Sequence, residues 1–266
     1  LGFVEIQITP YAMRDFELER RLVARFGLEF AVVVQPRAGA HNAYEILGRA
    51  LARTIEDRLV PGAVLGVSDG DTVAAVAAAI RRGKTSDVDV VSLIGGVGAP
   101  QIPSHSSEVC RMLAAGLGGR AWQLPVPAIV DDAVAAKALL DTAAVRSVFE
   151  TMRRSTIALV GVGSMSPRAT VFRHGVIDPG YIRTIAAKGA IGTICGRFFG
   201  PDGKPVPSDF DDRTLSVTLA ELAAVPLGIA AAVGAAKAPA IRAAVTGRLV
   251  NALGTDSETA RALLDG

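Results

Sequence analysis

Short apolar runs alternate with helix-forming segments along most of this 266-residue chain. The run "AVLGVS" (63–68) has the length and apolar character of a buried strand, and an alanine-rich helical segment follows it from Thr72. The same order of strand, glycine turn and helix recurs at "VDVVSLIGG" (88–96) and "TIALVGVGS" (156–164). Helices between successive strands favour a parallel sheet, and uniformly apolar strands are typical of a sheet covered on both faces. The pattern therefore predicts an α/β fold with a doubly wound, mainly parallel, Rossmann-like sheet.

Capping and helix-breaking residues set the limits of other predicted elements. Asp15 can cap a helix that runs to about Phe26, where Gly27 can end it. A helix is predicted over 42–59, and a last helix begins after Asp256. Further strands are predicted at "VEIQI" (4–8), "EFAVVV" (29–34), "AIGTICG" (190–196), "RTLSVTL" (213–219), "PLGIAAAVG" (226–234) and "LVNAL" (249–253). Further helices are predicted near 107–117, 179–188 and 236–245. The segment 198–213 is predicted to be a loop or flap.

Composition and charge exclude several classes of function. The formal net charge is +2, and the 28 basic and 26 acidic residues are mixed along the chain, so we do not expect this chain to bind nucleic acid on its own. The uncharged apolar stretch 222–236 is shorter than the roughly 18 residues that a membrane span needs. The three histidines have no metal-ligand spacing, and the two cysteines predict buried, reduced thiols. We therefore expect a cytoplasmic protein with no membrane span, no metal and no cofactor.

Three glycine turns at predicted strand ends point to one shared pocket. They are "GVSDGDT" (66–72), "IGGVG" (94–98) and "GVGSMS" (161–166). Ligands of open α/β sheets bind beyond the carboxyl ends of the strands, where free backbone N–H groups and helix N-termini attract polar oxygens. Each turn taken alone is also explained as a tight connection from strand to helix. None of the three is a dinucleotide fingerprint or a P-loop.

The first turn also fits the G-x-S-x-G pattern of a serine-hydrolase nucleophile, with Ser68 in the nucleophile position. A nucleophilic serine needs a histidine base, and in the hydrolase chain order that histidine comes last. No histidine follows His174, and acidic residues on both sides of Gly70 would oppose a developing oxyanion. A serine hydrolase is therefore the least favoured of the functions considered.

Eight motifs, in order and nearly end to end, resemble the effector-binding domain of SorC/DeoR-class bacterial sugar-responsive transcriptional regulators. The motifs are "VEIQIT" (4–9), "FELERRLVARFGLEFAVVV" (16–34), "LVPGAVLGVSDGDTVAAV" (59–76), "VVSLIGGVG" (90–98), "LPVPAIVDD" (124–132), "LVGVGS" (159–164), "GAIGTICGRFFGPDGKPV" (189–206) and "VGAAKAPAIRAAVTGRLVNALGTDSETARALL" (233–264).

The resemblance implies a fold related to ribose-5-phosphate isomerase and glucosamine-6-phosphate deaminase, with a smaller oligomerisation lobe. It implies one effector-binding domain over 1–266, which binds a sugar, polyol or sugar phosphate without catalysis. It also implies an N-terminal helix-turn-helix that this chain lacks, DNA contact only through that domain, and assembly as a homodimer or homotetramer. The rival function is a sugar-phosphate isomerase or deaminase on the same fold, for which Asp131 or Asp132 is the candidate base.

The resemblance, with the three turns, gives a set of candidate ligand-binding residues. Lys237 matches a lysine that reaches the ligand in relatives, and Arg168 or Arg173 supplies positive charge near the third turn. The set is Ser68, Asp69, Gly70, Asp71, Thr72, Gly95, Gly96, His105, Asp131, Gly163, Arg173, Thr193, Lys237 and Asp256.

The chain departs from the family pattern at three of these positions. Asp69 stands where the family often has Trp, Asp71 where it often has a basic, Gly or Thr residue, and Thr193 where it has an acid. Carboxylates repel a phosphate dianion, whereas they accept charge-assisted hydrogen bonds from hydroxyl groups. These departures favour an unphosphorylated sugar or polyol over a sugar phosphate, unless both side chains point to solvent. Ordering of the 198–213 flap over the bound effector is a further hypothesis.

Overall fold

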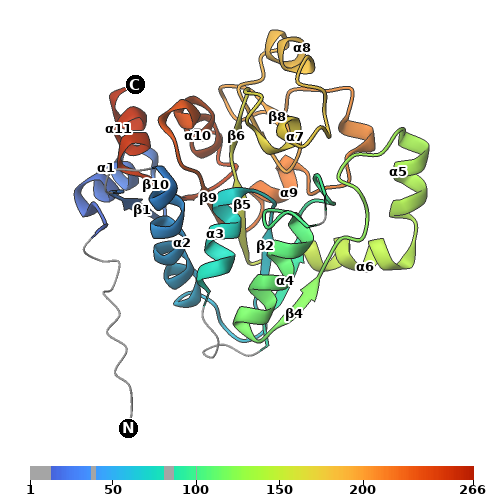
Figure 1. Ribbon diagram of the computed structural model, residues 1–266, viewed down its shortest axis with the longest axis horizontal. Helices are drawn as coiled ribbons and strands as arrows, with labels where there is room; N and C mark the ends of the chain where they lie inside the picture. The colour runs from blue at the N-terminus through green and yellow to red at the C-terminus, as the bar shows by residue number, and fades with distance from the viewer. Residues whose placement is uncertain (1–12, 37–39, 81–86, 100) are drawn as a thin grey trace.

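The computed structural model describes residues 13–36, 40–80, 87–99 and 101–266. A seven-stranded sheet forms its centre, with the strand order β1-β10-β9-β5-β2-β3-β4, and every neighbouring pair is parallel (Figure 1). Its strands are β1 Phe30–Val34, β2 Val64–Val67, β3 Asp89–Ser92, β4 Arg120–Trp122, β5 Ile157–Gly161, β9 Leu227–Ala231 and β10 Ala252–Asp256. The predicted doubly wound α/β fold is confirmed.

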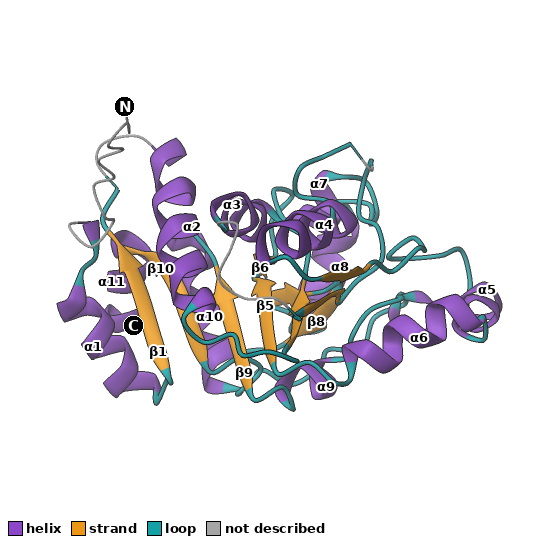
Figure 2. Cartoon of the chain, turned by 90° about the horizontal axis from the view of Figure 1, so that it is seen from below, coloured by secondary structure: helices purple, strands orange, loops and turns teal. Residues whose placement is uncertain are grey.

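Helices cover both faces of this sheet, as Figure 2 shows. One face carries α2 Ala40–Glu56, α3 Asp71–Ala79 and α4 Ser106–Leu117. The opposite face carries α1 Phe16–Phe26, α5 Ala133–Leu140, α6 Ala143–Met152, α9 Leu219–Ala223, α10 Ala238–Thr246 and α11 Ser257–Asp265. No helix among the described residues is long and apolar enough to cross a bilayer.

Successive strand residues alternate between two hydrophobic cores. On β5, Ala158 and Val160 belong to the core under α6 and α10, whereas Ile157 and Leu159 belong to the core under α2 to α4. Side chains of a strand point alternately to opposite faces, so both faces of β5 are apolar because both are covered. This accounts for the continuous apolar runs in the sequence.

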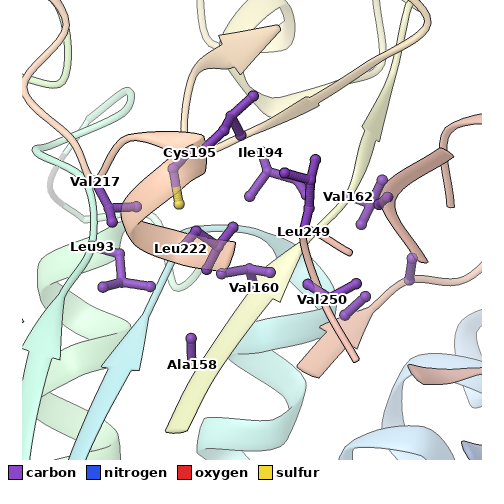
Figure 3. Packing of buried hydrophobic residues seen from close by; sticks show 14 of the residues in the cluster. Leu93, Ala158, Val160, Val162, Ile194, Cys195, Val217, Leu222, Leu249 and Val250 are labelled. Carbon is purple, nitrogen blue, oxygen red and sulfur yellow. The ribbon is translucent and has the colours of Figure 1, made fainter. Parts of the chain in front are cut away.

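A small antiparallel sheet stands above the carboxyl ends of the central strands (Figure 1). It has the order β6-β7-β8, with β6 Gly163–Ser164, β7 Gly192–Ile194 and β8 Arg197–Phe199, and it carries the short helices α7 Thr170–Arg173 and α8 Tyr181–Ala187. Ile194 and Cys195 pack in the same cluster as Val160 of the main sheet and Val162, which follows β5 (Figure 3). The small lobe therefore shares a core with the main sheet and is held against it.

Capping contacts confirm the predicted limits of the first helix and the predicted start of the last one. Asp15 accepts a hydrogen bond from the Leu18 N–H at 3.0 Å at the start of α1, and Gly27 ends that helix with φ +62°. Asp256 caps α11 as predicted, through the Thr259 N–H at 2.9 Å. Both cysteines are free and buried. The strand predicted at 4–8 lies outside the described residues.

Two strand predictions are wrong, and some elements were not predicted. The segment 213–219 forms only isolated bridges, at Thr214 and Ser216, and then starts α9. The strand predicted at 249–253 begins at Ala252 instead. Asn251, just before it, accepts from the Gly228 N–H and donates to the Pro226 carbonyl, both at 2.8 Å, and so ties the start of β10 to the start of β9. The two helices α5 and α6 have no counterpart in the sequence prediction.

Candidate functional site

A cavity of about 950 Å³ opens between the carboxyl ends of β2, β5 and β9 and the small lobe. The chain leaves β2 towards β3 and β4 on one side of the sheet, and returns at β5 on the other side. Such a topological switch point leaves a crevice in which α/β proteins bind ligands. Eight predicted site residues line the cavity: Asp69, Gly70, Asp71, Thr72, Gly163, Arg173, Thr193 and Lys237.

The turn after β2 is fixed by Ser68. Its N–H donates to the Leu159 carbonyl at 3.1 Å. Its hydroxyl donates to the Asp69 carbonyl at 2.8 Å and accepts from the Gly161 N–H at 3.0 Å. Ser68 is only 1% exposed and does not line the cavity. Its hydroxyl therefore ties the ends of two neighbouring strands together, in place of the nucleophile that the G-x-S-x-G pattern suggests.

Asp69 follows as a buried carboxylate in the cavity wall, 8% exposed. Burial raises the pKa of its carboxyl from 3.8 to about 6, the Asp71 charge adds to the rise, and its own backbone N–H and Arg173 oppose it. Among the described residues, no other side chain donates a hydrogen bond to this carboxylate. Gly70 then takes φ +117° and ψ 153°, which side-chain-bearing residues rarely adopt, and α3 begins.

Asp71 has a different environment from Asp69. Its two carboxylate oxygens accept from both terminal nitrogens of Arg173, at 2.8 and 3.1 Å, and its side chain is 48% exposed. The hydrogen bonds from Arg173 hold the pKa of Asp71 below its usual value, against a smaller opposing effect of burial. Because Arg173 lies on α7, the ion pair connects α3 of the main sheet to the small lobe across the cavity.

Lys237 approaches from the segment between β9 and α10. Burial lowers the pKa of its ammonium group, and the charges of Asp71 and Asp256 act in the opposite direction. Asp256 itself does not line the cavity. Its carboxylate accepts from the N–H of Gly234, a lining residue, at 2.8 Å, and thereby fixes this part of the wall from behind.

Hydroxyl groups supply most of the remaining polar lining. Thr193 on β7 stands at the position where the family resemblance implies an acid. It is 6% exposed, and its hydroxyl has no hydrogen-bond partner among the described residues. The sequence reasoning did not select Tyr44, Ser164, Ser166 or Thr170, which also line the cavity. The two serines belong to the third glycine turn, so the sequence pattern could have identified them. Tyr44 lies on α2, ten positions after the end of β1 in the sequence, and no turn motif marks it.

The second glycine turn does not line the cavity. The Gly95 N–H donates to the Leu215 carbonyl at 3.0 Å, and the Gly96 N–H to the Val126 carbonyl at 2.8 Å, so both backbone groups serve loop packing. His105 is buried and caps α4 through the Ser107 N–H at 3.2 Å, and burial lowers its pKa. Asp131 is exposed beside α5, where its carbonyl accepts from Arg213 at 3.4 Å.

The segment 198–213 also lies apart from the cavity. Phe198 and Phe199 are buried, and Phe210 packs edge-on against Tyr181 with ring centroids 4.8 Å apart. No cluster of potential metal ligands occurs in the described parts of the chain. A smaller cavity of about 220 Å³ lies beside β1 and α2, where Arg14 is paired with Glu19 and Arg58 covers the Phe30 ring.

Comparisons with known proteins identify the family to which the chain belongs. Residues 11–265 match the "Sugar-bind" family of sugar-binding domains. The chain is 30% identical to the deoxyribonucleoside regulator of Bacillus subtilis (strain 168), over 99% of this chain and 84% of that protein. It is 33% identical to the transcriptional regulator LsrR of Klebsiella pneumoniae, over 99% of this chain and 80% of that protein. The full-length sorbitol operon regulator SorC from Klebsiella pneumoniae superimposes with a TM-score of 0.89 at 26% identity, over 99% of this chain and 84% of that one. The chain belongs to the sugar-binding domain family of SorC/DeoR-class transcriptional regulators.

Proposed function

We propose that this domain binds its effector in the cavity at β2, β5 and β9, and that binding modulates DNA recognition by a helix-turn-helix joined to its N-terminal side. The effector is a sugar, polyol or sugar phosphate. The observation that carries the proposal is the composition of the cavity wall, where carboxylate, cationic and hydroxyl side chains from separate turns face one space of about 950 Å³. Small-molecule sites have volumes of roughly 300–1,000 Å³.

The chemistry of the wall suits a ligand with many hydroxyl groups. Asp69 can accept hydrogen bonds from ligand hydroxyls, and Lys237 can donate to ligand oxygens. Thr72, Thr193 and the serines of the third turn can do either, because a hydroxyl is both donor and acceptor. The names of the sorbitol operon regulator and the deoxyribonucleoside regulator support effectors of this class.

Thermal denaturation with a panel of free sugars, polyols and their phosphate esters tests the proposal. A ligand that binds only the folded state raises apparent stability, by about 2.7 kcal/mol at a hundred times its Kd. We expect at least one panel member to raise Tm in the native chain and to lose this effect in Lys237→Met. Lys204→Met, which changes an exposed lysine outside the cavity, is the matched control and should keep the effect. If no panel member raises Tm, the proposal fails.

An isomerase or deaminase on the same fold remains the alternative function. The previously considered base Asp131 is exposed and Asp132 caps α5, so neither borders the cavity. Asp69, whose pKa is raised to about 6, is the residue in the wall that favours this alternative, because a general base works best near the ambient pH. Proton NMR of ribose 5-phosphate or glucosamine 6-phosphate incubated with the chain decides between the two functions. We expect no turnover.

Assembly is part of the proposal. We expect the domain to form a homodimer or homotetramer in the cytoplasm, with the small lobe near the interface, and to contact DNA only through the helix-turn-helix. Light scattering coupled to size-exclusion chromatography, with and without the effector found above, measures the assembly state. A monomer under both conditions would contradict this part.

A further inference from the structure

We propose that Asp69 determines which part of the ligand the buried wall of the cavity accepts: an uncharged, hydroxyl-bearing part that donates hydrogen bonds to its carboxylate, assisted by the Thr193 hydroxyl. This inference rests on the sugar-binding function proposed above. It adds how the ligand is oriented in the cavity and which of its groups contact Asp69. It concerns two positions at which the chain departs from the pattern that its family resemblance implies.

The first argument is that the carboxylate of Asp69 has no side-chain partner among the described residues, and its own backbone N–H is the one donor that acts on it. Buried carboxylates in proteins are normally paired with a cation or held by several hydrogen bonds, because a bare buried charge costs free energy. Asp69 is 8% exposed and lines the cavity, yet no other described side chain donates to it. A ligand hydroxyl would supply the missing donor, and a hydrogen bond to a charged acceptor is about twice as strong as a neutral one.

The second argument is that the neighbouring carboxylate is already engaged. Asp71 is held by both terminal nitrogens of Arg173, at 2.8 and 3.1 Å, so its charge is balanced within the protein. The two aspartates of the first turn therefore have separate roles. Asp71 connects the two lobes, and Asp69 faces the ligand with its charge unbalanced.

The third argument is the position of Thr193 on the small lobe. Thr193 lines the same cavity and is more than nine-tenths buried, and its hydroxyl has no hydrogen-bond partner among the described residues. An uncharged hydroxyl here, where the family has an acid, can accept from the ligand or donate to it. Asp69 from the main sheet and Thr193 from the small lobe thus offer one charged and one neutral polar group to the same ligand.

Positive charge lies elsewhere on the wall. Lys237 comes from the segment before α10, and Arg168 is exposed in the loop after β6. A phosphate or carboxylate group of a ligand would be repelled at Asp69 and attracted to these cations. A singly phosphorylated ligand would therefore place its phosphate away from Asp69 and still present hydroxyls to it.

Calorimetric titration of matched variants tests the proposal. The probes are erythritol, ribitol, sorbitol, ribose and fructose, each with its monophosphate ester. For any probe that binds the native chain, Asp69→Asn should weaken binding about tenfold or more, because the charge is lost while the shape is kept. Thr193→Val, which keeps the branched shape, should weaken it about fivefold. Lys204→Met is the control for an unrelated charge and should leave the affinity unchanged.

The pH dependence of affinity gives a readout that a merely structural role of Asp69 would not change. For an unphosphorylated probe, the native chain should bind more tightly as pH rises from 5 to 7.5, because ionised Asp69 is the better acceptor, and Asp69→Asn should show no such rise. Phosphate esters are left out of this experiment, because their own second pKa of about 6 falls in the same range. The titratable groups that act on Asp69 or line the same cavity are the Asp71–Arg173 pair, Cys195, Tyr44 and Lys237. The pKa of Asp71 is lowered, and those of Tyr44, Arg173 and Cys195 are raised, away from this window.

Two controls complete the pH experiment. Burial lowers the pKa of Lys237, and Lys237→Met would abolish a pH dependence that came from it. His174 contacts Arg173 at 3.2 Å, and burial lowers the pKa of its imidazole. His174→Gln should therefore keep the rise in affinity if Asp69 is its source.

The outcomes separate the inference from the function on which it rests. If no probe binds the native chain, the sugar-binding proposal fails. If a probe binds and Asp69→Asn binds it equally well, the function stands and the inference is overturned. A gain in affinity of Asp69→Asn for a phosphate ester would also overturn it, because the phosphate would then lie beside residue 69.

Discussion

Replacing Asp69 by Asn should stabilise the unliganded domain at neutral pH, although it removes a residue that we assign to ligand recognition. The pKa of Asp69 is raised from 3.8 to about 6 by burial, so the folded state holds the proton more tightly than the unfolded chain. Above pH 6 the folded state must carry an ionised carboxylate in a site that favours the neutral form. Asn has nearly the shape of the neutral acid and carries no charge to bury.

The magnitude follows from the two pKa values. One pKa unit corresponds to about 1.4 kcal/mol, and the two values differ by roughly two units, so the gain at pH 7.5 is about 3 kcal/mol. The sign follows from the proton balance: the folded state binds more protons between pH 4 and 6, and stability from this group falls as pH rises through that window. The gain from Asn should therefore shrink to less than about 1 kcal/mol at pH 4.

Urea denaturation followed by circular dichroism at pH 4, 5, 6 and 7.5 measures this effect in both chains. For a domain of this size, the gain at pH 7.5 corresponds to a rise in Tm of about 6 °C. Asp71→Asn is the matched control and should be neutral or slightly destabilising, because it breaks a pair whose side chains are 39% and 48% exposed. Equal or lower stability of Asp69→Asn at pH 7.5, or a gain that persists unchanged at pH 4, would refute the reasoning.

Three further predictions concern the scaffold of the same turn. Ser68→Ala should lower the free energy of unfolding by about 1–3 kcal/mol, since it leaves the Gly161 N–H without its partner, and urea titration measures the loss; an unchanged midpoint would contradict the structural role of Ser68. Gly70→Ala should cost about 1–3 kcal/mol in the same assay through backbone strain alone, because φ is +117° and an added Cβ would meet no atom within 4 Å. A double-mutant cycle with Asp71→Asn and Arg173→Gln should give a coupling free energy below about 1 kcal/mol, which declines in 1 M salt because both side chains are exposed to solvent. A larger coupling that does not depend on salt would contradict this exposure.

Most strands of the central sheet were predicted from the sequence, because a buried strand appears there as a short apolar run and the alternation of such runs with helical segments indicates a parallel sheet. Most strands of this sheet are covered on both faces, so they read as apolar runs next to glycine turns. The edge strand β4, whose residues are exposed or half-buried, has no such run and was not predicted. Helix α5 left a weak trace, because only its Ala136 is buried and its apolar residues do not form the stripe that helical periodicity detects. Helix α6 does bury such a stripe, with Val145, Val148 and Met152 among its members, and the sequence prediction missed it.

The site was predicted in part, and the reason differs from residue to residue. Asp69 and Lys237 follow strand ends, and strand ends of a parallel sheet meet at one edge, so sequence reasoning could bring them together. His105 and Asp131 were selected on polarity near a matching motif, but polarity does not tell a helix cap or a surface loop from a ligand contact. Tyr44 could not be found, because its place in the wall depends on how α2 lies across the sheet, which is a tertiary property.

The contrast between Ser68 and Asp69 has a consequence for how domains of this kind acquire new ligands. Adjacent residues at a strand end point in opposite directions, so one of them can hold the architecture while its neighbour is free to change. Substitutions at position 69 alter the chemistry offered to a ligand without breaking the contact that joins β2 to β5. A substitution at position 69 can therefore change both stability and the accepted effector, while the framework that Ser68 holds together stays the same.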